Sequence, residues 1–165
     1  MAGRRVLVLI GSESDLTKVE PTITVLSQLG IDCELRVASA HRTPDRVAEL
    51  ASGARDRGFA VVVAAAGLAA ALPGAVAAHT TLPVVALPLA SGTLGGIDAL
   101  LACVQMPPGV PTATVGIDAA RNAGMLAAQI LALGDPALAS KLNKQRKSLT
   151  KGIEDSDARI GTGRR

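Results

Sequence analysis

Short runs of consecutive aliphatic residues recur along this chain, and segments with helical character separate them. Residues 6–10 and 60–65 are continuous apolar runs, which are typical of parallel strands buried on both faces of a sheet. Because crossovers between parallel strands are right-handed, helices then cover both faces. The alternation predicts an α/β fold: a three-layer αβα sandwich with a parallel, flavodoxin- or Rossmann-like sheet of about five strands.

The predicted elements follow one another without a linker or an internal repeat, so we expect a single domain over residues 1–165. Pro21 lies inside the first helix and should kink or restart it. The polar end of the chain, from about residue 137, is expected to be a helical tail, with a frayed end as the alternative. The predicted strands are residues 6–10, 33–37, 60–65, 84–87 and 112–117, and the predicted helices are residues 15–29, 44–57, 74–80, 95–104, 119–133 and 141–160.

The composition excludes several classes of protein. Hydrophobic residues make up 48% of the 165 residues and charged residues 19%, which provides for one packed core and argues against disorder. Aromatic residues are only 1%, whereas proteins that read nucleic acids by stacking need aromatic side chains. The net charge of +3 therefore does not indicate a nucleic-acid partner, and the basic residues near the C-terminus are interpreted as a solvated helix face.

The sequence also argues against an exported or membrane-bound protein. The apolar run at residues 6–10 is too short for a signal peptide, and Gly67 and Pro73 interrupt the longest uncharged stretch. Cys33 and Cys103 are isolated, which suits buried thiols in a reducing compartment rather than a metal or disulfide site. We therefore expect a cytoplasmic protein that contacts no membrane.

Ligands of open parallel sheets bind beyond the carboxyl ends of the strands, so the turns that follow the strands are the candidate sites. Residues 11–15, Gly-Ser-Glu-Ser-Asp, follow the first predicted strand. Glycine permits a sharp turn, while Ser12, Ser14 and the helix amides could hold a phosphate and Asp15 a ribose hydroxyl. The alternative is plain capping of the next helix by Ser14 or Asp15.

The second candidate is residues 39–44, Ser-Ala-His-Arg-Thr-Pro, after the second predicted strand. Arg42 offers a fork of donors for phosphate and Ser39 adds a hydroxyl. His41 is one of only two histidines and stands where a proton-transfer group could face a ligand. The alternative is a capping turn before the helix that Pro44 starts, with His41 partly exposed.

The third candidate is residues 66–74, after the third predicted strand. Its small residues would let a flat ring lie against the backbone, next to the amides that begin the following helix. The alternative is ordinary tight packing. His79 is interpreted as a surface or interface residue, and Asp118 as a helix cap. The candidate ligand-binding residues of this segment are Gly67, Ala69, Ala70, Ala71 and Leu72.

Together these segments resemble the PurE family, over a stretch from residue 6 to about residue 143. Each motif is weak alone, but their order and spacing are specific. The resemblance implies a class I N5-carboxyaminoimidazole ribonucleotide mutase, which moves a carboxyl group from the exocyclic nitrogen to carbon 4 of the ring in purine biosynthesis. It implies no cofactor and no metal. The motifs are residues 11–15, 39–44, 72–74, 104–107 and 109–111.

The resemblance also implies residue roles and an assembly. His41 would be the acid/base that carries the proton, and the small residues of the third segment would enclose the carbon dioxide. The assembly would be a homo-octamer with sites between subunits. The residues that would contact the ribonucleotide through its phosphate or ribose are Ser12, Ser14, Asp15, Ser39 and Arg42.

The third segment departs from the family pattern. Class I members typically read Ala-Ala-His-Leu-Pro-Gly, whereas residues 69–74 read Ala-Ala-Ala-Leu-Pro-Gly, so Ala71 replaces a site histidine. A natural subtype with altered chemistry, an engineered change and a non-catalytic ribonucleotide-binding paralogue are the three explanations. Class II members, which carboxylate aminoimidazole ribonucleotide directly with carbon dioxide, typically have Ser-Asn where Ala69 and Ala70 stand. The sequence therefore favours class I, with the direct carboxylase as the alternative.

Overall fold

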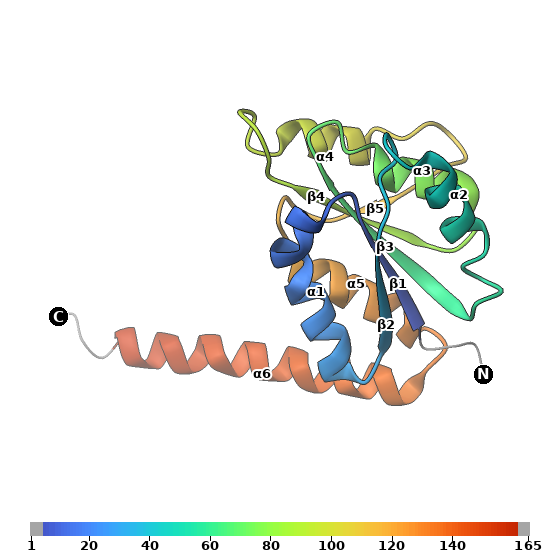
Figure 1. Cartoon of the computed structure of the whole chain (residues 1–165). Helices are drawn as coiled ribbons and strands as arrows, with labels where there is room; N and C mark the ends of the chain where they lie inside the picture. The colour runs from blue at the N-terminus through green and yellow to red at the C-terminus, as the bar shows by residue number, and fades with distance from the viewer. Residues whose placement is uncertain (1–4, 162–165) are drawn as a thin grey trace. The chain divides into compact units, whose positions relative to one another are not determined.

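The computed structural model describes residues 5–161 and confirms the predicted α/β fold. Five parallel strands form one sheet in the order β2-β1-β3-β4-β5, which is the order of flavodoxin-like folds. Helices lie on both sides of this sheet (Figure 1). One compact unit ends at Leu131 and a second begins at Ala132, and the single domain over the whole chain stays a prediction.

The strands are aliphatic because a strand covered on both faces needs apolar side chains on both. The first four extend slightly beyond their predicted bounds. The fifth is shorter than the predicted residues 112–117, because a turn in which the Ala119 amide donates to the Gly116 carbonyl, at 3.1 Å, ends it early. The strands are β1 (Arg5–Ile10), β2 (Asp32–Val37), β3 (Phe59–Gly67), β4 (Val84–Leu89) and β5 (Ala113–Thr114).

The helices agree with the prediction in number and order but differ at several ends. The first helix runs through Pro21 without a break, so the predicted restart is wrong. The ring removes only the hydrogen bond to the carbonyl of Thr17, which lies in an exposed turn. The helices are α1 (Leu16–Leu29), preceded by the 3-10 turn η1 (Glu13–Asp15), α2 (Pro44–Ser52), α3 (Ala71–His79), α4 (Ile97–Val104), α5 (Ala120–Ala132) and α6 (Pro136–Gly161).

Two further helix bounds differ from the prediction. Helix α2 ends at Ser52 rather than residue 57, because Gly53 follows it and the chain turns toward β3. Helix α3 begins at Ala71 rather than residue 74. Pro73 thereby falls in the first turn of the helix, where a missing amide removes no hydrogen bond.

Small side chains let the helices approach the sheet closely. On one face, the Thr22 hydroxyl of α1 donates to the Ala120 carbonyl of α5 at 2.8 Å. A side chain on Gly124 would lie 2.9 Å from the Thr22 carbonyl oxygen, so α1 and α5 need this glycine to pack. On the other face, α2, α3 and α4 cover a core whose buried members include Leu7, Leu9, Val47, Leu50, Val62, Leu72, Val76 and Cys103.

The prediction of buried thiols is confirmed for Cys103, while Cys33 on the edge strand β2 is half-buried. Burial raises the pKa of the Cys103 thiol to about 11. Burial also raises the pKa of the Cys33 thiol, and the Asp32 carboxylate adds to that effect. Both thiols are therefore protonated and unreactive at neutral pH.

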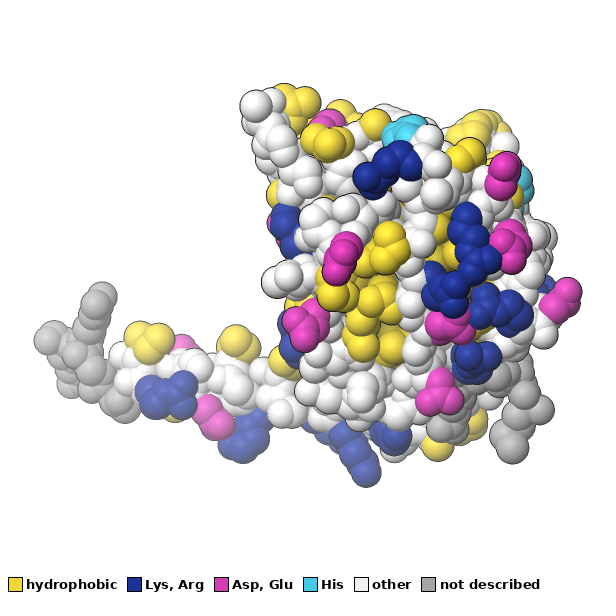
Figure 2. All heavy atoms as spheres, viewed as in Figure 1, with side chains coloured by type: hydrophobic (Ala, Val, Ile, Leu, Met, Phe, Trp, Pro, Cys, Tyr) yellow, Lys and Arg dark blue, Asp and Glu magenta, His cyan; other side chains and the backbone are white. Residues whose placement is uncertain are grey.

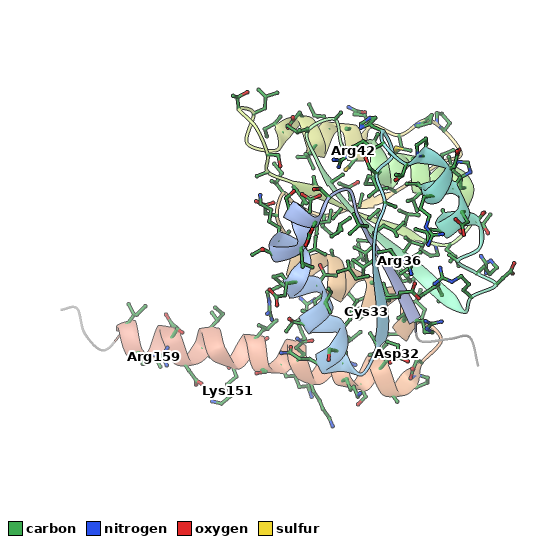
Figure 3. All side chains as sticks on the ribbon, in the orientation of Figure 1. Asp32, Cys33, Arg36, Arg42, Lys151 and Arg159 are labelled. Atoms are coloured by element: carbon green, nitrogen blue, oxygen red, sulfur yellow. The ribbon has the colours of Figure 1, made fainter. Side chains whose placement is uncertain are left out.

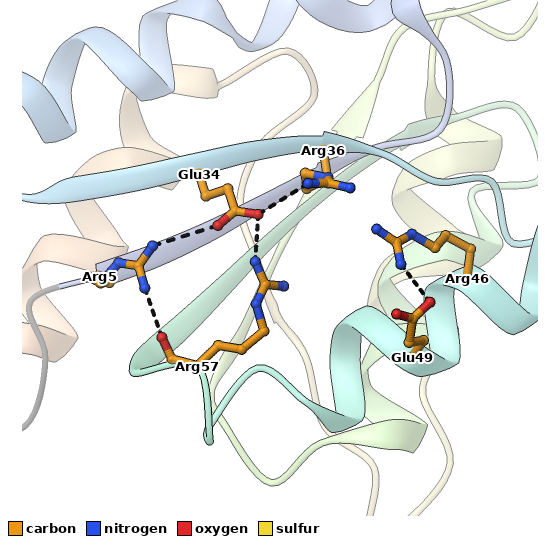
Figure 4. A network of polar contacts seen from close by, with 6 residues as sticks. All are labelled: Arg5, Glu34, Arg36, Arg46, Glu49 and Arg57. Atoms are coloured by element: carbon orange, nitrogen blue, oxygen red, sulfur yellow. Dashed lines mark hydrogen bonds and ion pairs between the residues drawn. The ribbon is translucent and has the colours of Figure 1, made fainter.

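Edge strand β2 is held to its neighbours by a cluster of arginines around Glu34 (Figure 4). The Glu34 carboxylate lies 2.6 Å from an Arg57 nitrogen and 3.6 Å from nitrogens of both Arg5 and Arg36. The Arg5 and Arg57 guanidinium groups also lie over the ring of Phe59, at 4.5 and 5.0 Å from its centroid. Figure 2 shows Lys and Arg side chains gathered on the right of the face drawn, with Asp and Glu among them.

The second unit contains α6, which confirms a helix at the polar end of the chain but begins at Pro136 rather than residue 141. The Asp135 carboxylate caps it by accepting from the Leu138 amide at 3.0 Å. Lys151 and Asp155 form an ion pair one turn apart, at 3.0 Å. Among residues 5–161, no helix is both long enough and apolar enough to cross a membrane.

Candidate active site

A cavity of about 490 Å³ lies at the carboxyl ends of the strands. Because β2, β1, β3 and β4 are consecutive in the sheet, the turns that follow them lie side by side, as expected for this fold. Every residue predicted for the site lines this cavity. They are Ser12, Ser14, Asp15, Ser39, His41, Arg42, Gly67, Ala69, Ala70, Ala71 and Leu72.

The turn after β1 presents two linked hydroxyls. The Ser12 hydroxyl oxygen accepts from the Ser14 hydroxyl at 3.0 Å and from the Ser14 amide at 3.4 Å. Ser12 is therefore the residue that caps η1, and capping by the Ser14 or Asp15 side chain is not observed. Asp15 is the N-cap of α1 but makes no side-chain cap hydrogen bond, which leaves its carboxylate for another partner.

Burial is the main influence on Asp15, and it raises the pKa of this carboxyl above its usual range. A hydrogen bond from the Ser12 backbone and the positive charges of Lys18 and Arg42 oppose that rise. A carboxylate that is partly desolvated in a cavity is a good acceptor for hydroxyl groups, because a bound ligand replaces hydrogen bonds to water that the carboxylate has lost.

Arg42 lies in the turn after β2, and its side chain is hydrogen-bonded to the turn after β1 and to its own turn. Its Nη2 donates to the Gly11 carbonyl at 2.7 Å and its Nε donates to the Ser39 hydroxyl at 3.2 Å. Its Nη1 makes no hydrogen bond to any residue in the range 5–161, so a donor remains for an anion. Figure 3 shows Arg42 at the carboxyl end of the sheet, at the opposite end of β2 from Asp32.

His41 lies next to Arg42 in the same turn, and its side chain is exposed and lines the cavity. Its imidazole forms no hydrogen bond with another described residue. Both ring nitrogens therefore remain available to a ligand, one as donor and one as acceptor in the neutral ring. The other histidine, His79, is exposed at the end of α3 and is not among the residues that line the cavity, in agreement with its predicted surface position.

The turn after β3 has an unusual backbone. Leu68 and Ala70 adopt positive φ angles of 53° and 38°, which cost about 1–3 kcal/mol for residues other than glycine and cluster at functional sites. The Ala70 amide donates to the Gly67 carbonyl at 3.0 Å, and no side chain caps the helix that begins at Ala71. The first turn of α3 therefore has no side-chain cap, and its residues Ala71 and Leu72 line the cavity.

Ala71 lies at the start of α3 with its side chain half-buried on the cavity wall. A methyl group stands there in place of the imidazole that the resemblance leads one to expect. The wall of the cavity on this side is consequently apolar. It is formed by the small or aliphatic residues Ala66, Gly67, Leu68, Ala69, Ala70, Ala71 and Leu72.

One lining residue was missed by the sequence reasoning. Ser91 follows β4 and lines the cavity opposite the turn after β2. The signal that could have found it is the one used for the first three turns, a small polar residue directly beyond a strand's carboxyl end. Asp118 was also interpreted wrongly, since its carboxylate accepts from the Ala90 amide and from Lys18 instead of capping α5.

The arrangement can bind an anion at one end and a flat ring along its apolar wall. Within residues 5–161, no group of three or more His, Cys, Asp or Glu residues is placed to hold a metal ion. Among the lining residues, Arg42 is the one Lys or Arg side chain. A phosphate would therefore bind beside Arg42, and His41 in the same turn lines the cavity that the rest of such a ligand would occupy.

Comparison with known proteins gives one consistent result. Residues 5–152 match the model of the AIR carboxylase family. The chain is 45% identical over 156 residues to the N5-carboxyaminoimidazole ribonucleotide mutase of Thermotoga maritima, covering 94% of this chain and 91% of that protein. It is 48% identical over 155 residues to the mutase of Methanocaldococcus jannaschii, covering 94% and 96%.

A solved structure agrees with the sequence matches. The crystal structure of Treponema denticola PurE superimposes with a TM-score of 0.86 at 29% identity, covering 94% of this chain and 98% of that one. The arrangement of strands and helices is therefore shared across nearly the whole length of the two proteins.

Proposed function

The chain belongs to the AIR carboxylase family, and from that premise we propose that it is an N5-carboxyaminoimidazole ribonucleotide mutase of purine biosynthesis. The observation that carries the proposal is that His41 and Arg42 line one cavity together with the apolar wall formed by the turn after β3. That arrangement provides the anchor, the proton carrier and the enclosure that the reaction needs.

The phosphate of the substrate binds between the turns after β2 and β1. Arg42 supplies a guanidinium that is fixed by its hydrogen bond to Ser39, and Ser14 and Ser39 line the same cavity. A hydrogen bond to a charged group contributes about 1.5–3 kcal/mol. The Asp15 carboxylate accepts from the ribose hydroxyls, which places the imidazole ring against the wall formed by residues 66–72.

His41 carries one proton through the reaction. The bond between the exocyclic nitrogen and the carboxyl carbon breaks, carbon dioxide is released, and the nitrogen keeps the electron pair and takes a proton from the imidazolium of His41. Carbon 4 of the ring then attacks carbon dioxide and gives up its proton to the imidazole. The proton count is unchanged at the end, so one histidine that gives up a proton in the first step and takes one back in the second is sufficient.

The apolar wall keeps carbon dioxide beside the ring between the two steps. Residues 66–72 present no charged side chain, so no cation on this wall stabilises the carboxylate against loss of carbon dioxide. Closure of the site from the open side requires another surface. A second subunit supplies it in the assembly that we propose, a cytoplasmic homo-octamer.

An exposed apolar face on α4 supports self-association. Leu94, Ile97, Leu101 and Val104 are 61%, 53%, 51% and 53% exposed. Ile97, Leu101 and Val104 are spaced so that they share one side of the helix. An apolar stripe of this kind on a small soluble protein marks a protein interface, and a second copy of this chain is the occupant that we propose.

Ala71 favours a second candidate function, a ribonucleotide-binding paralogue with little turnover. The anchor for the phosphate does not involve residue 71, so binding would survive the loss of a histidine there while proton transfer or carboxyl positioning would suffer. Direct carboxylation of aminoimidazole ribonucleotide by carbon dioxide is the other alternative within the family.

The test is an assay of the purified chain with N5-carboxyaminoimidazole ribonucleotide, following the product carboxylated at carbon 4. We expect turnover, and we expect Arg42→Met to raise KM by about 10- to 100-fold through loss of the charged hydrogen bond. The control is Arg46→Met, since Arg46 pairs with Glu49 outside the cavity. Tight binding without turnover would favour the paralogue, and product formed only from aminoimidazole ribonucleotide and carbon dioxide would favour the direct carboxylase.

A further inference from the structure

Ser91 lines the cavity but has no structural role that accounts for its hydroxyl group. It follows β4, is half-buried, and makes no side-chain hydrogen bond with any residue in the range that the structure describes. A serine hydroxyl that packing alone would place is usually bonded to the nearby backbone. This one is left with its donor and acceptor capacity facing the cavity.

Gly67 makes the room that Ser91 occupies. A side chain on Gly67 would lie 2.5 Å from the Ser91 hydroxyl oxygen and 2.9 Å from its β-carbon. Any residue larger than glycine would therefore displace Ser91 or the turn that carries it. The absence of a side chain at the end of β3 is what lets a hydroxyl from the neighbouring strand reach the same cavity.

The backbone just before Ser91 is held from two directions. The Ala90 amide donates to the Asp118 carboxylate at 2.9 Å, and the Ala90 carbonyl accepts from the Lys18 ammonium at 2.5 Å. Lys18 and Asp118 also pair with each other, at 3.1 Å. We call Lys18, Ala90 and Asp118 the Ala90 clamp. Both hydrogen-bonding groups of one peptide position are thereby fixed, which limits where Ser91 can point.

Asp118 reaches Ala90 because its own backbone is left-handed, with a φ of 52°. Such a conformation is uncommon outside glycine, although Asp tolerates it better than most residues. The backbone of the turn after β5 is therefore strained at Asp118, and the same residue fixes the turn after β4 through its hydrogen bond with the Ala90 amide. That arrangement is expected where the position of Ser91 matters.

Ser91 and Arg42 lie at opposite ends of the cavity. Arg42 follows β2 and Ser91 follows β4, with β1 and β3 between them, so three strand spacings of about 14 Å in all separate the two strand ends. A ribonucleotide whose phosphate binds at Arg42 therefore extends its ring toward Ser91. The group on the far edge of that ring meets Ser91 and the uncapped amides of α3, and no lining Lys or Arg side chain.

We propose that the Ser91 hydroxyl donates a hydrogen bond to the carboxylate that the reaction moves, and that the Ala90 clamp positions it. This inference rests on the proposed function and names the partner of one more residue in the same site. A neutral donor orients a carboxylate without the strong stabilisation that a cation would give it. The carboxyl group is thereby held in place while it can still leave as carbon dioxide.

The test compares two ribonucleotides that differ only in the carboxyl group. Binding of aminoimidazole ribonucleotide and of its 4-carboxy derivative is measured by calorimetry for the wild-type protein and for Ser91→Ala. We expect Ser91→Ala to weaken the carboxylated ligand about tenfold, the loss of one charged hydrogen bond, and to leave the other ligand unchanged. Thr93→Ala is the control, because it removes an exposed hydroxyl from the same turn outside the cavity.

A loss that is equal for both ligands, or absent for both, would overturn the assignment of Ser91. Wild-type protein that binds neither ribonucleotide would overturn the proposed function and the role of Ser91 with it. Lys18→Met tests the clamp: we expect it to weaken the carboxylated ligand in the wild-type background and to have little further effect once Ser91 is alanine. Additive losses in the double variant would show that the clamp does not act through Ser91.

Discussion

The space that a side chain on Gly67 would need lies 2.5 Å from the hydroxyl oxygen of Ser91. The same space is bounded at 3.1 Å by the carbonyl oxygen of Leu89, which is backbone and cannot rotate away. The end of β3 is therefore in contact with the end of β4 and with the turn that follows it. The glycine in this position is a requirement of packing as well as of ligand access.

Gly67→Ala should lower both stability and activity. Crowding of this kind costs about 1–3 kcal/mol of the free energy of unfolding, and displacement of Ser91 should reduce kcat/KM further. Denaturant unfolding and steady-state kinetics measure the two effects. The control is Gly116→Ala, where the new β-carbon would meet the Ala119 β-carbon at an ordinary 3.6 Å. Equal stability of the Gly67 variant and the wild type would contradict the packing that we describe.

Ala71→His tests the second candidate function: for a ribonucleotide-binding paralogue with little turnover it should raise turnover by about 100-fold, because the new imidazole would stand on the cavity wall where the family resemblance expects one and could take part in proton transfer. The measurement is kcat with N5-carboxyaminoimidazole ribonucleotide. Ala78→His adds a histidine to an exposed position on the same helix outside the cavity and should leave kcat unchanged. If the wild-type turnover is already high and does not increase in the variant, the ribonucleotide-binding paralogue with little turnover is excluded.

His41→Asn should abolish most turnover while it preserves binding. Loss of a general acid and base lowers kcat by about 10²- to 10⁴-fold, whereas the phosphate is held by other side chains. Turnover and the affinity for the 4-carboxy ribonucleotide are measured in parallel. His79→Asn is the matched control, since His79 is exposed at the end of α3 and lies outside the cavity lining. Undiminished turnover would remove His41 from the mechanism.

Asp15→Asn should stabilise the empty protein at neutral pH. Burial raises the pKa of this carboxyl in the folded state, so the protonated carboxyl favours the folded protein. This contribution to the free energy of unfolding is complete below the unfolded pKa of about 3.9 and is lost as pH rises through the folded pKa. The variant should therefore melt at a higher temperature than the wild type at pH 7. The gain in the free energy of unfolding should be less than about 1 kcal/mol, because solvent screens the group.

The difference between the two melting temperatures should shrink as pH falls through the folded pKa and should vanish below about pH 4, the unfolded pKa of the carboxyl. Thermal unfolding at several pH values follows the difference. The same substitution should weaken ribonucleotide binding, since it removes the acceptor proposed for the ribose. A variant less stable than the wild type at pH 7 would show that Asp15 is favourably rather than unfavourably charged in the fold.

Glu34→Gln should have the opposite pH dependence. The hydrogen bond from Arg57, with the charges of Arg36 and Arg5, lowers the pKa of Glu34, so its contribution is present above its unfolded pKa of about 4.3 and is lost as pH falls through the folded pKa. We expect a loss of up to about 1 kcal/mol at pH 7 that disappears in acid. Glu49→Gln, in a more exposed pair with Arg46, should lower the melting temperature less, because solvent screens that pair more strongly.

Much of the site could be predicted because its residues follow strands in the sequence. The turns after β1, β2 and β3 each carry a recognisable motif, and the rule that ligands bind at the carboxyl ends of parallel strands groups them. Ser91 escaped prediction, although it obeys the same rule, because a single serine between alanine and glycine forms no motif. The clamp escaped because it joins residues 18, 90 and 118, whose proximity depends on the order of the strands.

The amino-acid order by itself determined the α/β class, the parallel sheet and the three turns that supply most of the cavity lining, since periodic apolar runs and local turn motifs act over short stretches of chain. The tertiary structure decided what those stretches meet. Gly67 contacts Ser91, and Lys18 reaches Asp118, because the strand order β2-β1-β3-β4-β5 brings the ends of distant segments together. Contacts across such distances depend on the packing of the whole sheet and not on local propensity.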